Sequence, residues 1–386
     1  MFDVLLLNET CVRWNDGMNY KLLVILLVTP FIWMWSNAIY SQPSYLLEAK
    51  LYVEKITKPK PSWNGPTTGP VSQKTKTIVY VSADQRNGGA AGVGKAVEEA
   101  AKIIGWKFRL IDGQGTIAGR TAALIQASNL EPDGIVLGTV DGFEQAKTIQ
   151  IIAKKNIVVI GWHSLDKPGP ALEHGIFTNI ATDPIDVATA AGMYVVAESN
   201  GKAGVVIFND PIYSIGNAKA NAMADTIKKC KQCNVLFSDD THLKDTPFRM
   251  SQRTAFLLNR FGEKWTHSLA TNDLYFDYMP PSLIAAAIPG NGSPKNVSAG
   301  DGSISAYERI RTNHYQIGTV AEPLRVHGWQ AIDELNRAFA GEKASGYSTP
   351  VHLITVENIQ FDGGPRNEYD PDNGYRDIYK KIWGIK

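Results

Sequence analysis

The chain has 386 residues, enough for two domains, and its 44% hydrophobic and 20% charged residues are ordinary for a soluble globular protein. A formal net charge of +1 gives no electrostatic basis for binding nucleic acid or an anionic membrane surface. The composition therefore argues against a strongly basic nucleic-acid-binding protein, and the function has to be inferred from local patterns.

The first 41 residues have a different composition from the rest. Lys21 precedes an apolar run over residues 22–35, and the small residues Ser36 and Ala38 follow it. These are the three parts of a secretory signal peptide, so we expect a true start at Met18, cleavage after Ala38 and export to the periplasm. The apolar run is shorter than the ~20 residues that span a bilayer, which counts against the alternative of an uncleaved membrane anchor.

Residues 42–75 contain five prolines and are expected to form an irregular lead-in. After them, short apolar runs alternate with helical patterns. In a first series we predict strands at 77–82, 107–111, 134–138 and 158–162, and helices at 92–104, 119–128 and 142–155. In a second series we predict strands at 175–179, 204–208, 234–237, 266–270, 296–300 and 317–321, and helices at 185–199, 217–231, 254–261, 282–287 and from Ile304. Such alternation is typical of α/β proteins with parallel sheets, and two series suggest two lobes with a cleft between them.

The best defined stretch is the βαβ unit over residues 77–111. Its polar residues, 84–87, stand where the carboxyl end of the first strand meets the start of a helix, which is where open α/β sheets bind ligands. The following letters GAAGVGKA nearly match a nucleotide-binding P-loop. However, Ala96 stands where that loop needs a hydroxyl for its metal ion, so close helix packing is the favoured interpretation.

Cysteine usage agrees with export. Cys11 lies in the leader, which leaves Cys230 and Cys233 in the mature chain. A C-x-x-C pair can be a redox motif, half of a zinc site or a structural disulfide, and in an oxidising compartment we expect a disulfide, with free thiols as the alternative. The seven histidines show no metal-binding spacing, and no catalytic motif such as G-x-S-x-G is present. We therefore expect a binding protein without a metal or cofactor.

The order of several motifs carries a resemblance to a family. These motifs are the leader, VYVSADQRNGG, GIVLGTVD, IVVIGWHS, NIATDP, VVIFND, LATNDLYFD, NVSAGDGS and IGTVAEP. In this order they resemble the type I periplasmic solute-binding proteins, the ribose- and galactose-binding group of sugar ABC importers, over residues 76–344. The resemblance implies two Rossmann-like lobes joined by three hinge crossings. It places the first lobe at residues 76–182 with 323–349, and the second at 183–322 with 350–386.

The same resemblance implies a set of ligand-binding residues at the strand ends. They are Asp84, Arg86, Asn87, Asp141, Trp162, His163, Tyr213, Asn272, Asp301 and Glu322. Carboxylates and amides suit a sugar because adjacent hydroxyls both donate and accept hydrogen bonds, and an aromatic face can cover the ring. Asp301 and Asn272 are the best candidates for hydroxyl contacts, with Trp162 as the stacking platform. The alternative is that such Asp and Asn residues cap helices and turns.

Two departures from the ribose-binding pattern stand on the first lobe. Gly89 and Ala90 occupy the positions of two aromatic residues that cover the sugar, and His163-Ser164 replaces an Asp-Arg pair. The pocket is therefore built differently here, so the pattern does not choose between pentose and hexose, and a non-sugar solute stays open.

The resemblance thus predicts a monomeric, non-enzymatic binding protein that captures a small polar solute, a monosaccharide first of all, and presents it to the membrane permease of an ABC importer. A ligand-binding partner of a chemosensory receptor and an exported hydrolase are the alternatives. A repressor of the same fold would need an N-terminal helix-turn-helix, and the apolar leader occupies that place.

Overall fold

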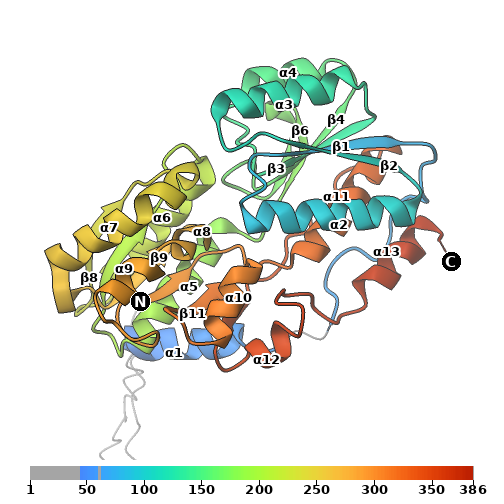
Figure 1. Ribbon diagram of the computed structural model, residues 1–386. Coiled ribbons are helices and arrows are strands. Elements are labelled where there is room, and N and C mark those ends of the chain that lie inside the picture. Colours follow the sequence, from blue (N-terminus) through green and yellow to red (C-terminus); the bar gives the residue numbers. More distant parts are fainter. Residues whose placement is uncertain (1–43, 60–61, 386) are drawn as a thin grey trace, which may run out of the picture. The chain divides into compact units, whose positions relative to one another are not determined.

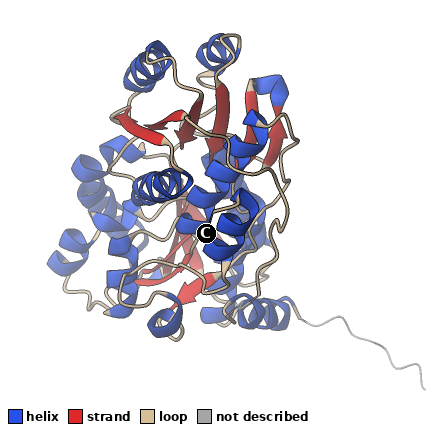
Figure 2. Cartoon of the chain, turned by 90° about the vertical axis from the view of Figure 1, so that its right-hand side faces the viewer, coloured by secondary structure: helices blue, strands red, loops and turns tan. Residues whose placement is uncertain are grey.

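The computed structural model describes residues 44–59 and 62–385 (Figure 1). The predicted signal peptide, with Met18 and Ala38, lies outside the described residues. Within them the chain forms two six-stranded, mostly parallel sheets, and Figure 2 shows helices on both sides of each group of strands. The predicted α/β fold with two lobes is confirmed. Among the described helices, none combines the length and the hydropathy that crossing a bilayer requires.

The first lobe contains the sheet with strand order β2-β1-β3-β4-β6-β5, in which only the β5–β6 pair is antiparallel. Its strands are β1 (Thr77–Ser82), β2 (Lys107–Asp112), β3 (Gly134–Gly138), β4 (Val158–Trp162), β5 (Gly169–Ala171) and β6 (Ile176–Ile180). Its helices are α2 (Gly88–Ile104), α3 (Ile117–Asn129), α4 (Ala146–Ala153) and α11 (Leu324–Phe339), with the 3-10 turn η1 (Leu172–His174). Two apolar clusters lie on the two faces of the sheet, one under α3 and α4 and the other under α2 and α11 (Figure 1).

The second lobe contains the sheet with strand order β12-β11-β10-β9-β7-β8, in which only the β11–β12 pair is antiparallel. Its strands are β7 (Gly204–Phe208), β8 (Asn234–Asp239), β9 (His267–Ala270), β10 (Lys295–Ser298), β11 (Gln316–Val320) and β12 (Leu353–Thr355). Its helices are α5 (Pro184–Glu198), α6 (Ser214–Lys228), α7 (Thr246–Phe261), α8 (Leu274–Asp277), α9 (Pro280–Ala285), α10 (Ile304–Arg311) and α12 (Ile359–Asp362), with the 3-10 turns η2 (Leu243–Asp245) and η3 (Gly262–Lys264).

Helix α2 illustrates how local sequence positions the cleft. Asn87 caps it by accepting hydrogen bonds from the backbone N–H groups of Gly89 and Ala90, and Gly105 ends it in the left-handed conformation at φ 85°. The helix therefore begins at Gly88, one turn before the predicted residue 92. This extra turn brings the first-lobe backbone to the edge of the cleft.

Three chain crossings join the lobes, and their residues contact one another. The first follows β6 at Thr182, the second follows β11 at Glu322, and the third precedes β12 at Thr349. The hydroxyl groups of Thr182 and Thr349 lie 2.6 Å apart, and the backbone N–H of Thr182 donates to Glu322 Oε2 at 3.3 Å. The three crossings are thus hydrogen-bonded into one hinge.

The predicted irregular lead-in contains a helix, α1 (Tyr45–Ile56). Ser44 caps it, and Ala49 and Ile56 on one face are buried against α5 in the core of the second lobe. Of the prolines that suggested an irregular segment, Pro43 precedes the helix and the others begin at Pro59, so residues 45–56 were free to form a helix.

Residues 62–75, which we call the strap, and the C-terminal helix α13 (Tyr375–Trp383) both pack on the first lobe. The Asn336 amide donates to Pro70 O at 2.8 Å, and the Trp106 indole donates to Gln73 O at 2.6 Å. The ring system that joins these segments, called the aromatic cluster below, consists of Trp63, Trp329, Tyr375, Tyr379 and Trp383. The predicted boundary gave residues 350–386 to the second lobe, whereas α13 returns to the first lobe because its apolar face completes that core.

Cys230 and Cys233 form a disulfide bond in the turn between α6 and β8. Both side chains are buried in the apolar cluster that also contains residues of α1 and α5. The pair therefore lies in the core of the second lobe, away from the residues at the strand ends.

Candidate functional site

The carboxyl ends of the strands of both lobes enclose a cavity of about 40 Å³, which we call the cleft cavity. From the first lobe it is lined by Asn87, Thr139 and His163. From the second lobe its polar lining is Asp210, Tyr213, Lys219, Thr271, Asn272 and Asp301. Ile215 and Leu243 supply apolar surface. The strand-end rule that located the site in the sequence therefore also holds for both sheets of the folded chain.

Two first-lobe lining residues have unusual backbone conformations. Thr139 has φ 58° and His163 has φ 54°, both in the left-handed region that side chains with a Cβ rarely adopt. Each such residue costs roughly 1–3 kcal/mol and is found preferentially at functional sites. The backbone of the first lobe is thus strained where it turns its side chains toward the cavity.

Four charged or titratable side chains form a buried group beside the cavity. His163 Nε2 lies 2.8 Å from Glu322 Oε2, and His163 Nδ1 lies 3.6 Å from Asp301 Oδ1. Lys219 Nζ lies 3.8 Å from Asp301 and 3.9 Å from Glu322, and it donates to Ala299 O at 2.8 Å. Two carboxylates, an ammonium group and an imidazole therefore lie together, and we call these four side chains the charged quartet.

The quartet shifts the pKa values of its carboxyl groups in opposite directions. Burial raises the pKa of Asp301, and the nearby Lys219 and His163 only partly offset this. Burial would also raise the pKa of Glu322, but His163 and Lys219 outweigh it and lower the pKa to about 2. Burial lowers the pKa of the neighbouring His327 to about 4. Glu322 is therefore the permanent anion of the quartet, and Asp301 is the group that protonates first.

Asn272 and Asp301, the best sequence-based candidates, are neighbours in the cavity wall. The Asn272 amide donates to Asp301 Oδ2 at 2.9 Å, and its oxygen accepts from the backbone N–H of Leu274 at 3.0 Å. Both side chains are nearly fully buried. The structure brings together the two groups that were expected to meet hydroxyls, and their contact with a ligand stays a prediction.

Of the other predicted residues, Asn87, His163 and Tyr213 also line the cavity, whereas Glu322 stands behind His163. Tyr213 OH accepts a hydrogen bond from Arg120 Nη1 at 3.3 Å, and this bond connects the two lobes. Burial raises the pKa of Tyr213, so its hydroxyl stays protonated and can donate.

Like Glu322, the predicted residues Asp84, Arg86 and Asp141 do not line the cavity. Asp84 and Arg86 pair with each other at 2.6 Å, and the Arg86 side chain is 46% exposed. Asp141 accepts from the backbone N–H groups of residues 143 and 144 and, across the lobes, from that of Ser214 at 2.7 Å. These carboxylates act on turns and on the lobe contact, which is the capping alternative that the sequence left open.

Trp162 lies behind the cavity wall. Its indole is fully buried, is stacked on the His163 ring at 4.1 Å between centroids, and donates to His327 Nδ1 at 3.0 Å. It does not line the cavity, so the geometry does not support the predicted stacking role. The strand β4 ends at Trp162 and His163 has a positive φ, so the two rings lie stacked on each other, with His163 on the side of the cavity.

Lys219 was missed in the sequence, although a signal existed. It lies in α6 four residues from the buried Ile215 and four from the buried Met223. A lysine at this spacing stands on the buried face of a helix and therefore needs a polar partner. Thr139, Asp210 and Thr271 carried no comparable signal.

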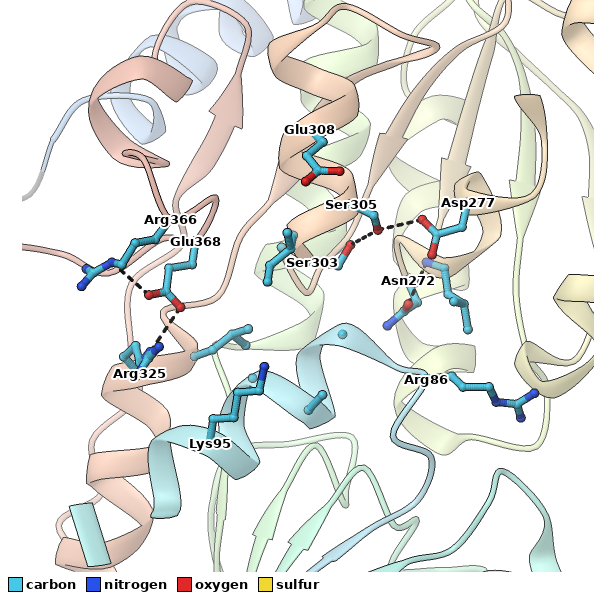
Figure 3. Close-up of a pocket in the computed structure, with 17 residues that line it drawn as sticks. Arg86, Lys95, Asn272, Asp277, Ser303, Ser305, Glu308, Arg325, Arg366 and Glu368 are labelled. Atoms are coloured by element: carbon cyan, nitrogen blue, oxygen red, sulfur yellow. Dashed lines mark hydrogen bonds and ion pairs between the residues drawn. The ribbon is translucent and has the colours of Figure 1, made fainter. Parts of the chain in front are cut away.

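Beside the cavity, the two lobes also form a larger groove of about 640 Å³, shown in Figure 3. One wall consists of Arg86 and the first two turns of α2, and the opposite wall is formed by α8 and the start of α10. Asn272 lines both the groove and the cleft cavity. The two spaces are therefore neighbours along the same boundary between the lobes.

One cluster within the described residues has the composition of a metal site. Single ligand atoms of His163, Asp301 and Glu322 all lie within 4.8 Å of one another. However, the Lys219 ammonium group lies beside both carboxylates and already compensates part of their charge. A cation would have to displace Lys219, so the arrangement favours hydrogen bonding to a polar solute.

The chain is similar to one protein family in sequence and to several solved proteins in structure. A search of the curated proteins finds no match. Residues 78–343 match the family model of the periplasmic binding protein domain. A glucose-galactose binding protein from Geobacillus stearothermophilus is similar in structure, with a TM-score of 0.65 at 17% identity, over 74% of this chain and 99% of that chain.

Two solute binding proteins of ABC transporters are similar to the same degree. One from Agrobacterium vitis, bound with alpha-D-tagatopyranose, has a TM-score of 0.67 at 14% identity over 76% of this chain and 99% of that chain. One from Bacillus halodurans, with bound myo-inositol, has a TM-score of 0.63 at 15% identity over 74% of this chain and 96% of that chain. At such identities these likenesses establish the fold alone. The family match covers most of the chain, and the chain therefore belongs to the periplasmic binding protein domain family.

Proposed function

We propose that this chain is the substrate-binding component of an ABC importer and captures a monosaccharide between its two lobes. The observation that carries the proposal is the composition of the cleft cavity. Two amides, two carboxylates, an ammonium group, an imidazole and a tyrosine hydroxyl converge there from both lobes, and all are nearly fully buried. Such groups pair with the adjacent hydroxyls of a sugar, each of which donates and accepts a hydrogen bond.

The described arrangement is a closed one. A Cβ added to Gly89 would lie 2.3 Å from Asp301 Oδ2, so the first-lobe backbone touches the second-lobe carboxylate directly. The cavity of about 40 Å³ is far smaller than the ~300–1,000 Å³ of usual ligand pockets. A sugar therefore enters only when the lobes separate, and it favours a closed form by contacting both of them.

Export and delivery complete the proposal. The leader over residues 18–38 would direct the chain to the periplasm, where a loaded, closed form is distinguished from an empty one by the permease. Relatives of the same fold are described as binding glucose and galactose, tagatose or myo-inositol, which supports a polyhydroxylated solute as the ligand class. Mass spectrometry of the mature chain should find an N-terminus just after Ala38.

The ligand class is tested by thermal unfolding with a panel of pentoses, hexoses and polyols, followed by calorimetric titration of each hit. A ligand at 100 times its Kd stabilises the folded state by ~2.7 kcal/mol, which raises the melting temperature measurably. A panel in which only amino acids or nucleosides raise it would contradict a sugar ligand. Incubation of the chain with a separate panel of glycosides, analysed for released sugars, tests the hydrolase alternative, since turnover of a glycoside would contradict a purely binding role.

A further inference from the structure

The groove beside the cleft cavity is by far the larger of the two spaces, about 640 Å³ against 40 Å³. A volume of this size lies within the ~300–1,000 Å³ range of small-molecule sites. It exists in the closed arrangement, in which the cleft cavity has nearly disappeared. The closed lobes therefore keep room for part of a ligand outside the strand-end cavity.

The wall between cavity and groove consists of contacts between the lobes. On the first lobe Asn87 lines the cavity and the next residue, Gly88, lines the groove; on the second, Asp301 lines the cavity and Gly302 the groove. Across this wall, a Cβ on Gly88 would lie 2.6 Å from Ser303 Cβ. Asn272 lines both spaces, so a small separation of the lobes at these contacts would join them there.

Small residues on α2 leave the volume of the groove unfilled on the side of the first lobe. Gly88, Ala91 and Gly92 line the groove on the first lobe. Between them, in the first turn of α2, this chain has Gly89 and Ala90 where the ribose-binding pattern has aromatic side chains. Large side chains here would fill the space into which a ligand could extend, and the small ones leave it open.

The lining carries polar groups of both charges beside apolar surface. Lys95 on α2 and Glu308 on α10 are exposed and project toward the groove from opposite lobes (Figure 3). Within the described residues, neither side chain has a hydrogen-bond or ion-pair partner. Ser303 and Ser305 add hydroxyl groups, and the Asp277 carboxylate accepts from Ser305 at 2.8 Å. Donors and acceptors on both walls suit the hydroxyls of a second sugar unit better than an apolar or a uniformly charged substituent.

We infer that the ligand of this chain is a disaccharide or a comparable glycoside, with one sugar unit in the cleft cavity and the second in the groove. This inference rests on the proposed function and specifies its substrate class. The first unit is held by the Asn272 and Asp301 pair, and the second lies between α2 and α10. Asn272, which lines both spaces, stands at the linkage.

The test compares monosaccharides (glucose, galactose, arabinose) with disaccharides (lactose, maltose, cellobiose) by calorimetric titration of the full mature chain. We expect a disaccharide to bind at least ~10-fold more tightly than either of its component sugars. Ala91→Trp fills the groove and should abolish this advantage while it changes monosaccharide affinity less than ~2-fold. Lys102→Trp, on the exposed side of α2 outside the groove, is the matched control and should change neither affinity.

The outcomes separate this inference from the proposed function. A monosaccharide that binds as tightly as any disaccharide, in the wild type and in Ala91→Trp alike, overturns the disaccharide assignment and leaves sugar binding intact. If no carbohydrate of either length binds to the folded wild-type chain, the proposed function fails and the present inference fails with it. Lys95→Ala gives a milder second variant, for which a selective loss of disaccharide affinity supports the groove as the second subsite.

Discussion

The cleft cavity and the aromatic cluster are both buried, yet their chemistry is opposite. The cavity is bordered by the charged quartet of His163, Lys219, Asp301 and Glu322. The cluster stacks indole and phenol rings, as in the Trp329–Trp383 pair with centroids 5.5 Å apart and an angle of 8° between planes. Burial of charge is unfavourable unless each group is paired, whereas burial of large rings is the main source of stability.

The aromatic cluster and the charged quartet therefore have different roles, the first in stability and the second in ligand binding. The aromatic cluster fixes the strap and α13 to the first lobe, and no member of it lines the cavity or the groove. The quartet connects both lobes and the hinge, where a polar ligand can replace protein contacts. Changes in the cluster should therefore alter the stability of the fold, and changes in the quartet should mainly alter ligand affinity and its dependence on pH.

The largest effect is expected from Trp383→Ala. Trp383 is 1% exposed, stacks on Trp329 and donates to Asp333 Oδ1 at 2.9 Å. Its removal should lower the free energy of unfolding by about 3–5 kcal/mol, measured by urea denaturation, with ligand affinity unchanged. Trp383→Phe keeps an apolar ring but loses the hydrogen bond, so its free energy of unfolding should lie between those of the wild type and Trp383→Ala. A loss below ~1 kcal/mol for the alanine variant would show that the cluster does not stabilise the fold.

Asp301→Asn should have the largest effect on binding. The substitution keeps the shape of the side chain but removes the charge that faces Lys219 and His163. Hydrogen bonds to charged groups contribute about 1.5–3 kcal/mol, so we expect ligand affinity to fall about 10- to 100-fold in calorimetric titration. Asp225→Asn, on the exposed surface of the second lobe, is the control and should leave affinity unchanged. Equal affinity in both variants would remove Asp301 from the site.

The fold could be predicted from the sequence more completely than the members of the site. The sheets were predicted because each strand and helix carries its own apolar periodicity, and the strand-end rule located Asn272 and Asp301. Helix α1 was missed because its partner, α5, is some 130 residues away in the sequence, and such packing leaves only a weak local signal. The beginning of α7 at Thr246, two turns before the predicted residue 254, was missed because its first turns are largely polar.

The site residues that could not be assigned depend on side-chain direction. The letters W-H-S identify the loop after β4 but do not say which ring faces the cavity. Trp162 packs in the core under α2 and α11. The left-handed backbone conformation of His163 directs the His163 side chain toward the cleft cavity. Lys219 was overlooked because its partners, Asp301 and Glu322, come from distant loops. Local spacing can locate such a site, but tertiary packing decides its members.

The buried carboxyl groups of the charged quartet should also make the stability of the fold depend on pH. Because the pKa of Glu322 is lowered to about 2 from the ordinary 4.5, its ionised form adds stability that is present above pH 4.5 and lost as the pH falls toward 2. The raised pKa of Asp301 acts in the opposite sense, since its contribution is present below the ordinary 3.8 and lost as the pH rises through the raised value. The effect of Glu322 is therefore best measured where Asp301 is absent.

We expect Asp301→Asn to lose about 2 kcal/mol more stability than the double variant Asp301→Asn, Glu322→Gln between about pH 5 and pH 3. Urea denaturation across this range measures the difference between the two proteins. Parallel curves would mean that Glu322 is not held ionised by His163 and Lys219 in the folded chain. Trp383→Phe, which leaves the quartet untouched, should follow the pH profile of the wild type.

The smallest effect is expected from Trp162→Phe, which distinguishes the sequence-based role of Trp162 from its position in the structure. If the indole only supports His163 and His327 from behind, its replacement removes one hydrogen bond at 3.0 Å and lowers the free energy of unfolding by about 1 kcal/mol. Ligand affinity should then fall less than ~3-fold, because His163 still faces the cavity and the ring stack persists in part. Calorimetric titration and urea denaturation of the same preparation separate the two effects. A loss of affinity as large as that of Asp301→Asn would mean that the lobes, on binding, bring the indole into contact with the ligand and that the cavity wall rearranges around His163.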